Sequence, residues 1–445
     1  MLLESRVLTA LYRLQRHGHE AFIVGGCIRD SLMGNTPKDW DICTSALPQE
    51  TAACFPDYPQ IETGLKHGTL TIVLDDLPLE ITTYRIDGSY SNLRQPDSVG
   101  FSSSLQEDLA RRDFTINAMA YNPEAGLIDP YNGQQDIQRG IIRCVGNADT
   151  SFQEDALRIM RALRFASQLG FQMADDAAQS IHANRQLLRA LAVERLADEL
   201  TRILQGAEVV PVLLAYADVL EVFIPEISPM LGLAQNTPYH EYDVWRHTLK
   251  SIALVPPTKV LRLTMLLHDS GKPAMHTTDA NGVDHFKQHR IKSAEIAQTV
   301  LERLRYDNET VSAVVELVGY HDIPIEVSAV RKWLYRIGPQ RFKQLLEVKT
   351  ADDLAKAPGY QAARLAHIAD LWEAFAEVVK SGQCFQLKDL AVNGEDLLAL
   401  GIEPGPQLGF MLNELLLNVM EDQLPNVKAA LLAFVRSKLL DEACD

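Results

Sequence analysis

Two aspartates, Asp39 and Asp41, lie two residues apart in the stretch GNTPKDWDICTS. The run DWDICT is typical of a strand, in which side chains alternate between faces. Both carboxylates should therefore point one way, while Trp40 and Ile42 point into the opposite packing layer. Two like charges on one face repel each other unless a divalent cation neutralises them. The spacing indicates a metal clamp, and the alternative is a solvated strand end.

A glycine pair lies upstream of these aspartates, in the stretch VGGCIRD. An apolar run over 22–24 predicts a strand that leads into Gly25 and Gly26, and a helix is expected to follow. Glycines at such a turn let backbone N–H groups approach a phosphate, and Arg29 is placed to pair with its oxygens. The pattern indicates a phosphate-binding turn beside the metal clamp, although tight turns also require glycine for steric reasons alone.

Phosphoryl transfer with two metal ions commonly uses a third carboxylate, which must lie on a strand next to the first two. Glu80 in PLEITTYR is the best placed, because Ile81 and Thr83 should face the other way.

Further along, the stretch EDLARRDFTINAMAY places Arg112 where it could bind a triphosphate. In the alternative interpretation this segment starts a helix, and Asp113 is its cap.

The stretch EDALRIMRALRF is predicted to be one helix that carries a nucleotide-selecting pair. Asp155 and Arg158 are three residues apart and therefore neighbours on one helix face. Arg161 and Arg164 continue the same ridge. A carboxylate that accepts from an amino group, beside a guanidinium that donates to a ring nitrogen, fits adenine and cytosine but not guanine and uracil. The pair predicts selection of ATP and CTP, and the alternative is an ordinary intrahelical salt bridge.

The length, composition and charge of the chain limit the classes of protein to which it can belong. The chain has 445 residues, 47% of them hydrophobic and 23% charged, which fits a folded protein of about two to four domains. It has no run of the ~18 apolar residues that a membrane span needs, no secretory-signal pattern, and six cysteines without CxxC spacing. A cytoplasmic protein without a membrane partner is therefore expected. The net charge of −17 argues against a broad cationic surface for nucleic acid.

The character of the sequence changes near residue 145. Short β-rich runs such as AFIVGG, DWDICT and GTLTIVL come before it, separated by turn clusters over 86–92 and 93–98. Almost everything after it has helical spacing, as in AVERLADELTRILQG. We predict an α/β head followed by three helical parts, with the bounds 1–146, 147–228, 229–356 and 357–445.

Together these motifs carry a family resemblance. GGCIRD, KDWDI, EITTYR, EDLARRDFTINAMAY, GLIDPYNG and EDALRIMRALRFASQLGF follow the order and spacing of the class II tRNA nucleotidyltransferases, the CCA-adding enzymes, and of the related bacterial poly(A) polymerases. The resemblance implies a polymerase-β-like (α+β) head with a small mixed sheet, an all-α neck that binds the base and RNA, and a tail that binds tRNA. It implies magnesium (Mg²⁺) at Asp39 and Asp41. The nucleotide-binding residues that it implies are Gly26, Arg29, Arg112, Asp155, Arg158, Arg161 and Arg164.

A second set of residues that could bind metal lies in the helical part. Imidazoles and carboxylates from several helices can converge inside a bundle to hold one or two metal ions, although a single histidine is more often an ordinary core or surface residue. The set is His247, His268, Asp269, His289, His321 and Asp322. It resembles the HD-domain phosphohydrolases, apart from Ser270, where that family commonly has Ile or Leu. The resemblance implies a divalent transition metal (Ni, Mn, Co or Fe) and a phosphohydrolase activity.

The predicted function is template-independent addition or repair of the 3′-terminal CCA of tRNA. CTP and ATP would be the substrates and the tRNA 3′ end the partner, with Asp39, Asp41 and Glu80 as the catalytic carboxylates. One alternative is a poly(A) polymerase, or an enzyme that adds only A or only CC. The other is an HD-domain phosphohydrolase whose head merely binds nucleotides. The sequence predicts no oligomeric state.

Overall fold

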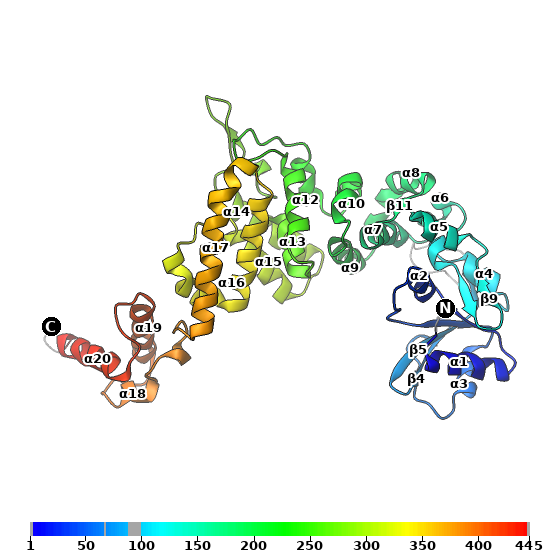
Figure 1. Cartoon of the computed structure of the whole chain (residues 1–445), viewed down its shortest axis with the longest axis horizontal. Coiled ribbons are helices and arrows are strands. Elements are labelled where there is room, and N and C mark those ends of the chain that lie inside the picture. Colours follow the sequence, from blue (N-terminus) through cyan, green and yellow to red (C-terminus); the bar gives the residue numbers. More distant parts are fainter. Residues whose placement is uncertain (1–2, 66–67, 88–98, 443–445) are drawn as a thin grey trace. The chain divides into compact units, whose positions relative to one another are not determined.

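The computed structural model describes residues 3–65, 68–87 and 99–442 (Figure 1). The chain forms two compact units. The first unit comprises Met1–Pro229 and Thr299–Asp307, and the second comprises Met230–Gln298 and Asn308–Asp445. The predicted four-part division is finer than this, and it placed residues 299–307 in the third part, whereas they pack with the first unit.

A seven-stranded mixed sheet forms the core of the head, as predicted. Its strand order is β3-β4-β5-β2-β1-β8-β9. Strands β2 and β5 pair in parallel, while the other neighbours are antiparallel. The strands are β1 (Ala21–Val24), β2 (Asp41–Thr44), β3 (Gln60–Ile61), β4 (Thr69–Leu74), β5 (Leu77–Thr83), β8 (Ala120–Asn122) and β9 (Gly126–Ile128).

Hydrophobic side chains cover both faces of this sheet. On one face, α1 (Ser5–Arg16) and α3 (Pro48–Cys54) share a core with Ile42 of β2. Helix α1 is amphipathic because its buried residues recur at helical spacing. These residues are Val7, Ala10, Leu11 and Leu14. On the other face, Cys43 of β2 belongs to a separate cluster with residues of α4 (Leu105–Ala110). Strand β2 is therefore packed on both sides.

Helices follow the sheet along the chain. The predicted helix over EDALRIMRALRF is divided, since α6 (Ala148–Glu154) ends before Asp155 and α7 (Leu157–Leu169) starts after it. The segment AVERLADELTRILQG forms α9 (Val193–Leu204), which packs against α7. The other helices of this unit are α2 (Gly26–Leu32), α5 (Gly133–Arg139), α8 (Asp175–Asn184), α10 (Val209–Ala215) and α11 (Ala217–Leu220).

Two small sheets complete the first unit. They pair β6 (Arg85–Asp87) with β7 (Val99–Phe101), and β10 (Ile141–Ile142) with β11 (Gln172–Met173). The turn cluster predicted over 93–98, and most of the one over 86–92, lie outside the described residues.

The second unit consists of helices and one short hairpin. Helices α12 (Val244–Leu254), α13 (Lys259–Leu267), α15 (Asn308–Tyr320) and α16 (Val330–Leu354) pack against one another. Helix α16 is kinked at Gly338, where φ is +76° directly before a proline. The remaining elements are the hairpin β12 (Thr277–Thr278) and β13 (Asp284–His285), α17 (Pro358–Ser381), α18 (Gly394–Leu398), α19 (Pro406–Met420) and α20 (Lys428–Glu442). Helix α14 (His289–Arg303) begins in this unit, and its residues from Thr299 on belong to the first unit.

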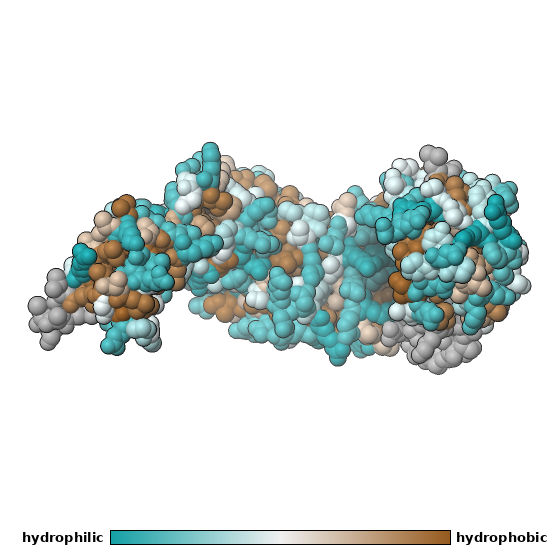
Figure 2. Space-filling view, turned by 90° about the horizontal axis from the view of Figure 1, so that it is seen from below, coloured by the Kyte–Doolittle hydropathy of each residue, from teal (hydrophilic) through white to brown (hydrophobic). Residues whose placement is uncertain are grey.

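The helices α18 to α20 enclose a hydrophobic cluster of their own. Figure 2 shows further hydrophobic residues on the outside of this part, and Phe410, Leu417 and Val427 are exposed there. Binding of tRNA by the tail stays a prediction. Every helix within the described ranges is too short or too polar to cross a membrane.

Candidate active site

The predicted acidic pair lies at the start of β2. The strand begins at Asp41, so Asp39 precedes it and is not part of the strand, contrary to the prediction. Exposure nevertheless alternates through the segment: the two aspartates are exposed, whereas Trp40 and Ile42 are 7% and 0% exposed. Both carboxylates therefore face away from the core that contains Trp40 and Ile42.

Glu80 lies in β5 directly opposite Asp41 in the parallel pair. Paired residues of neighbouring strands point to the same face, so their carboxylates are neighbours. Desolvation by the surrounding protein raises the pKa of Asp41; Arg112 opposes this rise, and Glu80 and Asp39 add to it. In the part of the chain that the structure describes, these three carboxylates do not bring three oxygens within 4.8 Å of one another. Bringing them together requires a cation that offsets their repulsion.

The glycine turn lies next to these carboxylates. Gly25 connects β1 to α2 with a φ of +80°, a conformation that favours glycine. A Cβ atom at Gly25 would lie 3.2 Å from Nη1 of Arg112 and 3.9 Å from Oδ2 of Asp41. A Cβ atom at Gly26 would lie 3.5 Å from Nη2 of Arg29. The turn thus allows two guanidinium groups and a carboxylate to approach the backbone closely.

A buried carboxylate that the sequence analysis did not identify holds Arg112. Asp108 of α4 is fully buried, and its Oδ2 accepts from Nη2 of Arg112 at 3.1 Å, while its Oδ1 accepts from Arg111. Burial opposes the charge of Arg112, but the charge and hydrogen bond of Asp108, together with the charge of Asp41 and the Cys43 thiol, outweigh it and raise the pKa of Arg112. The residues after Asp113 form only a short 3-10 turn, Thr115–Asn117, whose N-cap is Phe114, so the alternative that Asp113 caps a helix is wrong.

Asp113 instead connects the head to α7. Its Oδ2 accepts from Nε and Nη2 of Arg161 at 2.8 and 2.5 Å, and its Oδ1 accepts from Nδ2 of Asn117 at 3.1 Å. Asn117 in turn accepts from Nη1 of Arg29 at 2.8 Å. Burial favours the neutral form of Asp113, but the charge of Arg161 and the hydrogen bonds from Arg161, Asn117 and the backbone together outweigh it and hold the pKa of Asp113 below its usual value. Two predicted nucleotide-binding arginines are therefore joined through Asp113 and Asn117.

Asp155 does not share a helix face with Arg158, contrary to the prediction. It occupies the break between α6 and α7, where its Oδ1 accepts from the backbone N–H of Leu157 at 3.0 Å. Its Oδ2 lies 3.8 Å from Nη2 of Arg195 in α9. Burial raises the pKa of Asp155, against the effect of these two partners. The helix is interrupted here because an aspartate side chain can accept a hydrogen bond from a nearby backbone N–H, which then does not need a carbonyl of the preceding helical turn.

The other two arginines of this segment are engaged by acidic partners. Arg158 is buried, and its Nη1 donates to Oγ of Ser151 at 2.8 Å and to Oε2 of Glu154 at 3.1 Å. Arg164 forms an ion pair with Glu199 of α9 at 3.2 Å. Burial lowers the pKa of Arg164 to about 10, so it remains charged at neutral pH.

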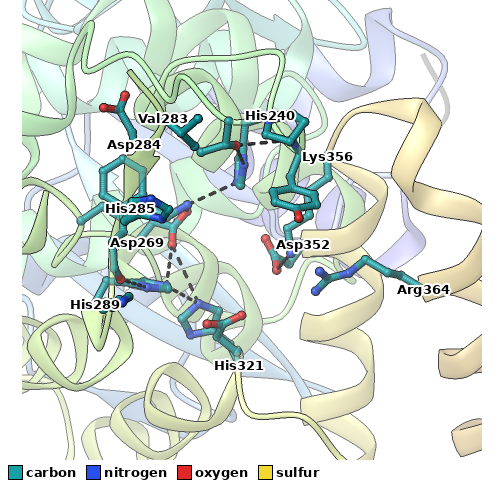
Figure 3. A pocket seen from close by; sticks show the side chains of 17 residues that line it. His240, Asp269, Val283, Asp284, His285, His289, His321, Asp352, Lys356 and Arg364 are labelled. Carbon is teal, nitrogen blue, oxygen red and sulfur yellow. Dashed lines mark hydrogen bonds and ion pairs between the residues drawn. The ribbon is translucent and has the colours of Figure 1, made fainter. Parts of the chain in front are cut away.

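The second unit contains two groups of buried side chains that could bind metal. They lie beside a pocket of about 510 Å³, and Figure 3 shows the second group and Asp352 of the first among the side chains that line it. Within each group the ligand atoms lie within 4.8 Å of one another, so each group could hold a metal ion. Asp269 belongs to one group and also contacts the other: its Oδ1 lies 3.3 Å from Nε2 of His289 in its own group, and its Oδ2 lies 3.2 Å from Nε2 of His268 in the other. The first group is His247, His268 and Asp352, and the second is Asp269, His289 and His321.

The hydrogen bonds of His289 and His321 favour a cation between them. Their Nδ1 atoms contact the carbonyl oxygens of Phe286 and Val318 at 2.9 and 2.7 Å and must carry the proton, because a carbonyl can only accept. In the neutral form, each ring then has its lone pair on Nε2, and these two atoms lie 3.2 Å apart. Two nitrogens bound to one tetrahedral metal at about 2.1 Å are separated by about 3.4 Å.

Asp352 of α16 completes the first group, and the sequence analysis missed it. Its Oδ1 lies 2.9 Å from Nε2 of His247, and its Oδ2 accepts from Lys356 at 2.6 Å. Asp322 is exposed and belongs to neither group among the described residues. Its position next to His321 suggested a shared site, but adjacent residues after a helix point in different directions. The sequence around Asp352 gave little indication of a metal ligand, because this aspartate lies within a segment that has only ordinary helical spacing.

The sheet, the glycine turn and the acidic face define a nucleotidyltransferase with a polymerase-β-like head and a helical body. Three family models match the chain. "Poly A polymerase head domain" matches residues 21–143, "Probable RNA and SrmB- binding site of polymerase A" matches 170–231, and "tRNA nucleotidyltransferase domain 2 putative" matches 288–435.

Individual proteins give a narrower assignment. The chain is 34% identical over 428 residues to a CCA-adding enzyme of Lactiplantibacillus plantarum, covering 95% of this chain and 93% of the relative. A CCA-adding enzyme of Geobacillus thermodenitrificans is 49% identical over 212 residues, 47% of this chain, and the match spans only 52% of that relative's length. The crystal structure of the Bacillus stearothermophilus CCA-adding enzyme in complex with CTP has a TM-score of 0.74 at 30% identity and covers 99% of both chains. The chain belongs to the CCA-adding enzyme family.

Proposed function

We propose that this protein adds CCA to the 3′ end of tRNA from CTP and ATP without a template. One observation carries the proposal: Asp41 and Glu80 lie opposite each other in a parallel strand pair, beside a glycine turn and Arg112. Carboxylates for a divalent cation and donors for a triphosphate are what nucleotidyl transfer requires. The CTP complex of the Bacillus stearothermophilus relative supports the choice of nucleotide. A tRNA substrate also fits the predicted cytoplasmic location.

Three sets of residues would bind the metal ion, the phosphates and the base. Asp39, Asp41 and Glu80 would hold Mg²⁺, which neutralises the triphosphate and orients the attacking 3′-hydroxyl. Guanidinium groups at the glycine turn would bind the phosphates. Asp155 and Arg158 would select the base after exchanging their present partners for its amino group and ring nitrogen. The proposed nucleotide-binding residues are Gly25, Gly26, Arg29, Arg112, Asp155, Arg158, Arg161 and Arg164.

The test incubates the purified protein with tRNA that lacks its 3′ CCA and with labelled CTP and ATP, singly and combined. We expect ordered addition of C, C and A, followed by arrest. Asp39→Ala should abolish incorporation and leave the circular dichroism spectrum unchanged. Unlimited addition of A would favour a poly(A) polymerase, and a protein that incorporates neither nucleotide would contradict the proposal.

A second function is proposed for the second unit, namely metal-dependent hydrolysis of phosphate esters. It is supported by the facing Nε2 atoms of His289 and His321 and by Asp269, which contacts both ligand groups. A transition metal bound there would lower the pKa of a water ligand and so supply a nucleophile. Lys272, which donates to Asp269 at 2.7 Å, and Lys356, which donates to Asp352, line the pocket in which a phosphate would bind.

This proposal is tested with p-nitrophenyl phosphate in the presence of Ni²⁺, Mn²⁺, Co²⁺ or Fe²⁺. Asp269→Asn should abolish hydrolysis and metal binding, measured by metal analysis after gel filtration. Asp322→Asn is the matched control, since that aspartate is exposed and outside both groups, and it should retain both properties. Equal losses in the two variants would contradict the assignment of the ligands, and an absence of hydrolysis with every metal would contradict the activity.

A further inference from the structure

Three arginines surround one phenyl ring in the first unit. The guanidinium carbons of Arg29, Arg161 and Arg164 lie 5.1, 5.6 and 4.6 Å from the centroid of Phe165. These distances fall within the range in which a cation is attracted to the face of an aromatic ring. Arg29 belongs to α2 of the head, whereas the other two arginines and Phe165 belong to α7. The ring is therefore the point at which both elements bring their cations together.

Phe165 is itself fixed in place. Its side chain is 6% exposed, and its ring meets that of Phe114 edge to face, with centroids 5.7 Å apart and an interplanar angle of 85°. Phe114 is fully buried in the head. An edge-to-face contact leaves a ring face available to cations. The position of Phe165 is thus set by the hydrophobic core and not by the arginines.

Three like charges around one ring need compensation. Each arginine has an acidic partner: Asp30 for Arg29 at 2.8 Å, Asp113 for Arg161 and Glu199 for Arg164. These partners do not exhaust the donors. Among the hydrogen bonds of the described residues, Arg29 donates three and Arg161 two of their five N–H groups. Guanidinium donors therefore remain for a ligand.

We infer that Phe165 is a positioning residue that gathers Arg29, Arg161 and Arg164 into a single binding site for the triphosphate of the incoming nucleotide. The inference rests on the proposed nucleotidyl transfer. The ligand is a phosphate group because guanidinium groups match its oxygens in charge and geometry. The place also fits, since Nη2 of Arg29 lies at the glycine turn whose other glycine is close to Oδ2 of Asp41.

The role predicts a specific kinetic signature. Replacing Phe165 with leucine removes the aromatic face but keeps an apolar side chain of similar shape. Loss of three weak cation–ring attractions should raise the KM for CTP and for ATP by about tenfold. Both values should rise equally, since the triphosphate is common to the two nucleotides, and kcat should change much less. Inorganic tripolyphosphate, used as a competitive inhibitor, should lose affinity to the same extent.

Two further variants separate positioning from packing. Phe165→Tyr keeps the ring and should restore the KM values. Phe114→Leu removes the other ring of the edge-to-face pair but leaves the ring of Phe165 beside the three arginines, so it should raise the KM values much less than Phe165→Leu does.

The inference is overturned if Phe165→Leu keeps wild-type KM values, if only one nucleotide is affected, or if Phe114→Leu has an equal effect. Should Phe165→Leu fail to fold, Phe165→Met gives the same comparison. A wild-type protein that incorporates no nucleotide would instead contradict the proposed function. Calorimetric titration of wild type and Phe165→Leu with tripolyphosphate would still decide the role of the ring.

Discussion

Replacing Glu80 with glutamine should make the first unit more stable and less active at the same time. Glu80 lies opposite Asp41 in the parallel pair of β5 and β2, and neighbouring strands are separated by about 4.8 Å. Without a cation the two carboxylates repel each other, which is one reason why the pKa of Asp41, raised mainly by desolvation, is high. Glutamine has nearly the same shape as glutamate and removes the charge alone.

The size of the effect follows from the distance and the exposure. Two unit charges about 5 Å apart repel by roughly 0.8 kcal/mol in water and about 3 kcal/mol at an effective dielectric constant of 20. Solvent reaches Glu80 and part of Asp41, so screening keeps the repulsion toward the lower value even though the surrounding protein partly desolvates the Asp41 carboxylate. Glu80→Gln should therefore raise the free energy of unfolding by ~1 kcal/mol in EDTA, or the melting temperature by about 2–4 °C.

The assay is differential scanning calorimetry in EDTA and in Mg²⁺ with CTP, where the transition that shifts with CTP identifies the first unit. In parallel, CTP incorporation should fall at least about 100-fold, a loss of about 2.7 kcal/mol in transition-state stabilisation. Glu62→Gln is the control, because Glu62 is exposed and follows β3, two strands away from β5. A destabilised Glu80→Gln variant, or one with normal incorporation, would refute the reasoning.

Three more predictions concern the same unit. Gly25 and Gly34 have nearly the same backbone conformation, with φ values of +80° and +79°, so alanine at either position should lower the free energy of unfolding by about 1 kcal/mol. Of the two, only Gly25 has neighbours within 4 Å of an added Cβ atom, so only Gly25→Ala should raise the KM for CTP. The pKa of Asp113 is lower in the folded protein than in the unfolded chain, so its ionised carboxylate stabilises the fold above the unfolded-state pKa and this stabilisation is lost as the pH falls. Asp113→Asn should therefore make the free energy of unfolding, measured as a function of pH, fall less steeply below pH ~4. Arg158→Ala should increase misincorporation of UTP and GTP more than it weakens triphosphate binding, measured by single-nucleotide assays, and equal changes would contradict a role in base selection.

The sequence allowed much of the head to be predicted because its signals are local. Alternation of polar and apolar residues placed Trp40 and Ile42 in the core and the two aspartates outside it, and the burial of these residues agrees. The choice of Glu80 depended only on its strand neighbours, and the register sets it opposite Asp41. Short-range periodicity is sufficient for such statements, since it does not depend on which distant segments pack together.

The failures have two causes: local bonding that overrides the predicted period, and contacts between elements that are distant in the sequence. Asp155 fits the helical spacing of its neighbours, but its carboxylate bonds the N–H of Leu157 and ends the helix there. Asp352 joins His247 only because α16 packs against α12. Asp108 was not singled out and Asp113 was considered only as a helix cap in the alternative interpretation, although each holds an arginine of the nucleotide site. Contacts between distant elements cannot be read from the spacing within either one.

The two proposed metal sites differ in burial, and this difference predicts different retention of metal. The carboxylates of the head are exposed, and oxygen ligands at an open surface exchange Mg²⁺ readily. In the second unit, His289 and His321 are 8% and 3% exposed, and in their neutral forms without a cation the Nε2 lone pairs face each other at 3.2 Å. Metal should therefore be held more tightly there, because its loss leaves this repulsion uncompensated in a buried place.

Brief dialysis against EDTA should consequently abolish CTP incorporation, with full recovery on adding Mg²⁺, while metal analysis still finds transition metal bound to the protein. His321→Ala should lose this retained metal and keep Mg²⁺-dependent incorporation, since it lies in the other unit. Simultaneous depletion of both metals from the wild type would show that burial does not control retention. Loss of incorporation in His321→Ala would show that the two sites are not independent.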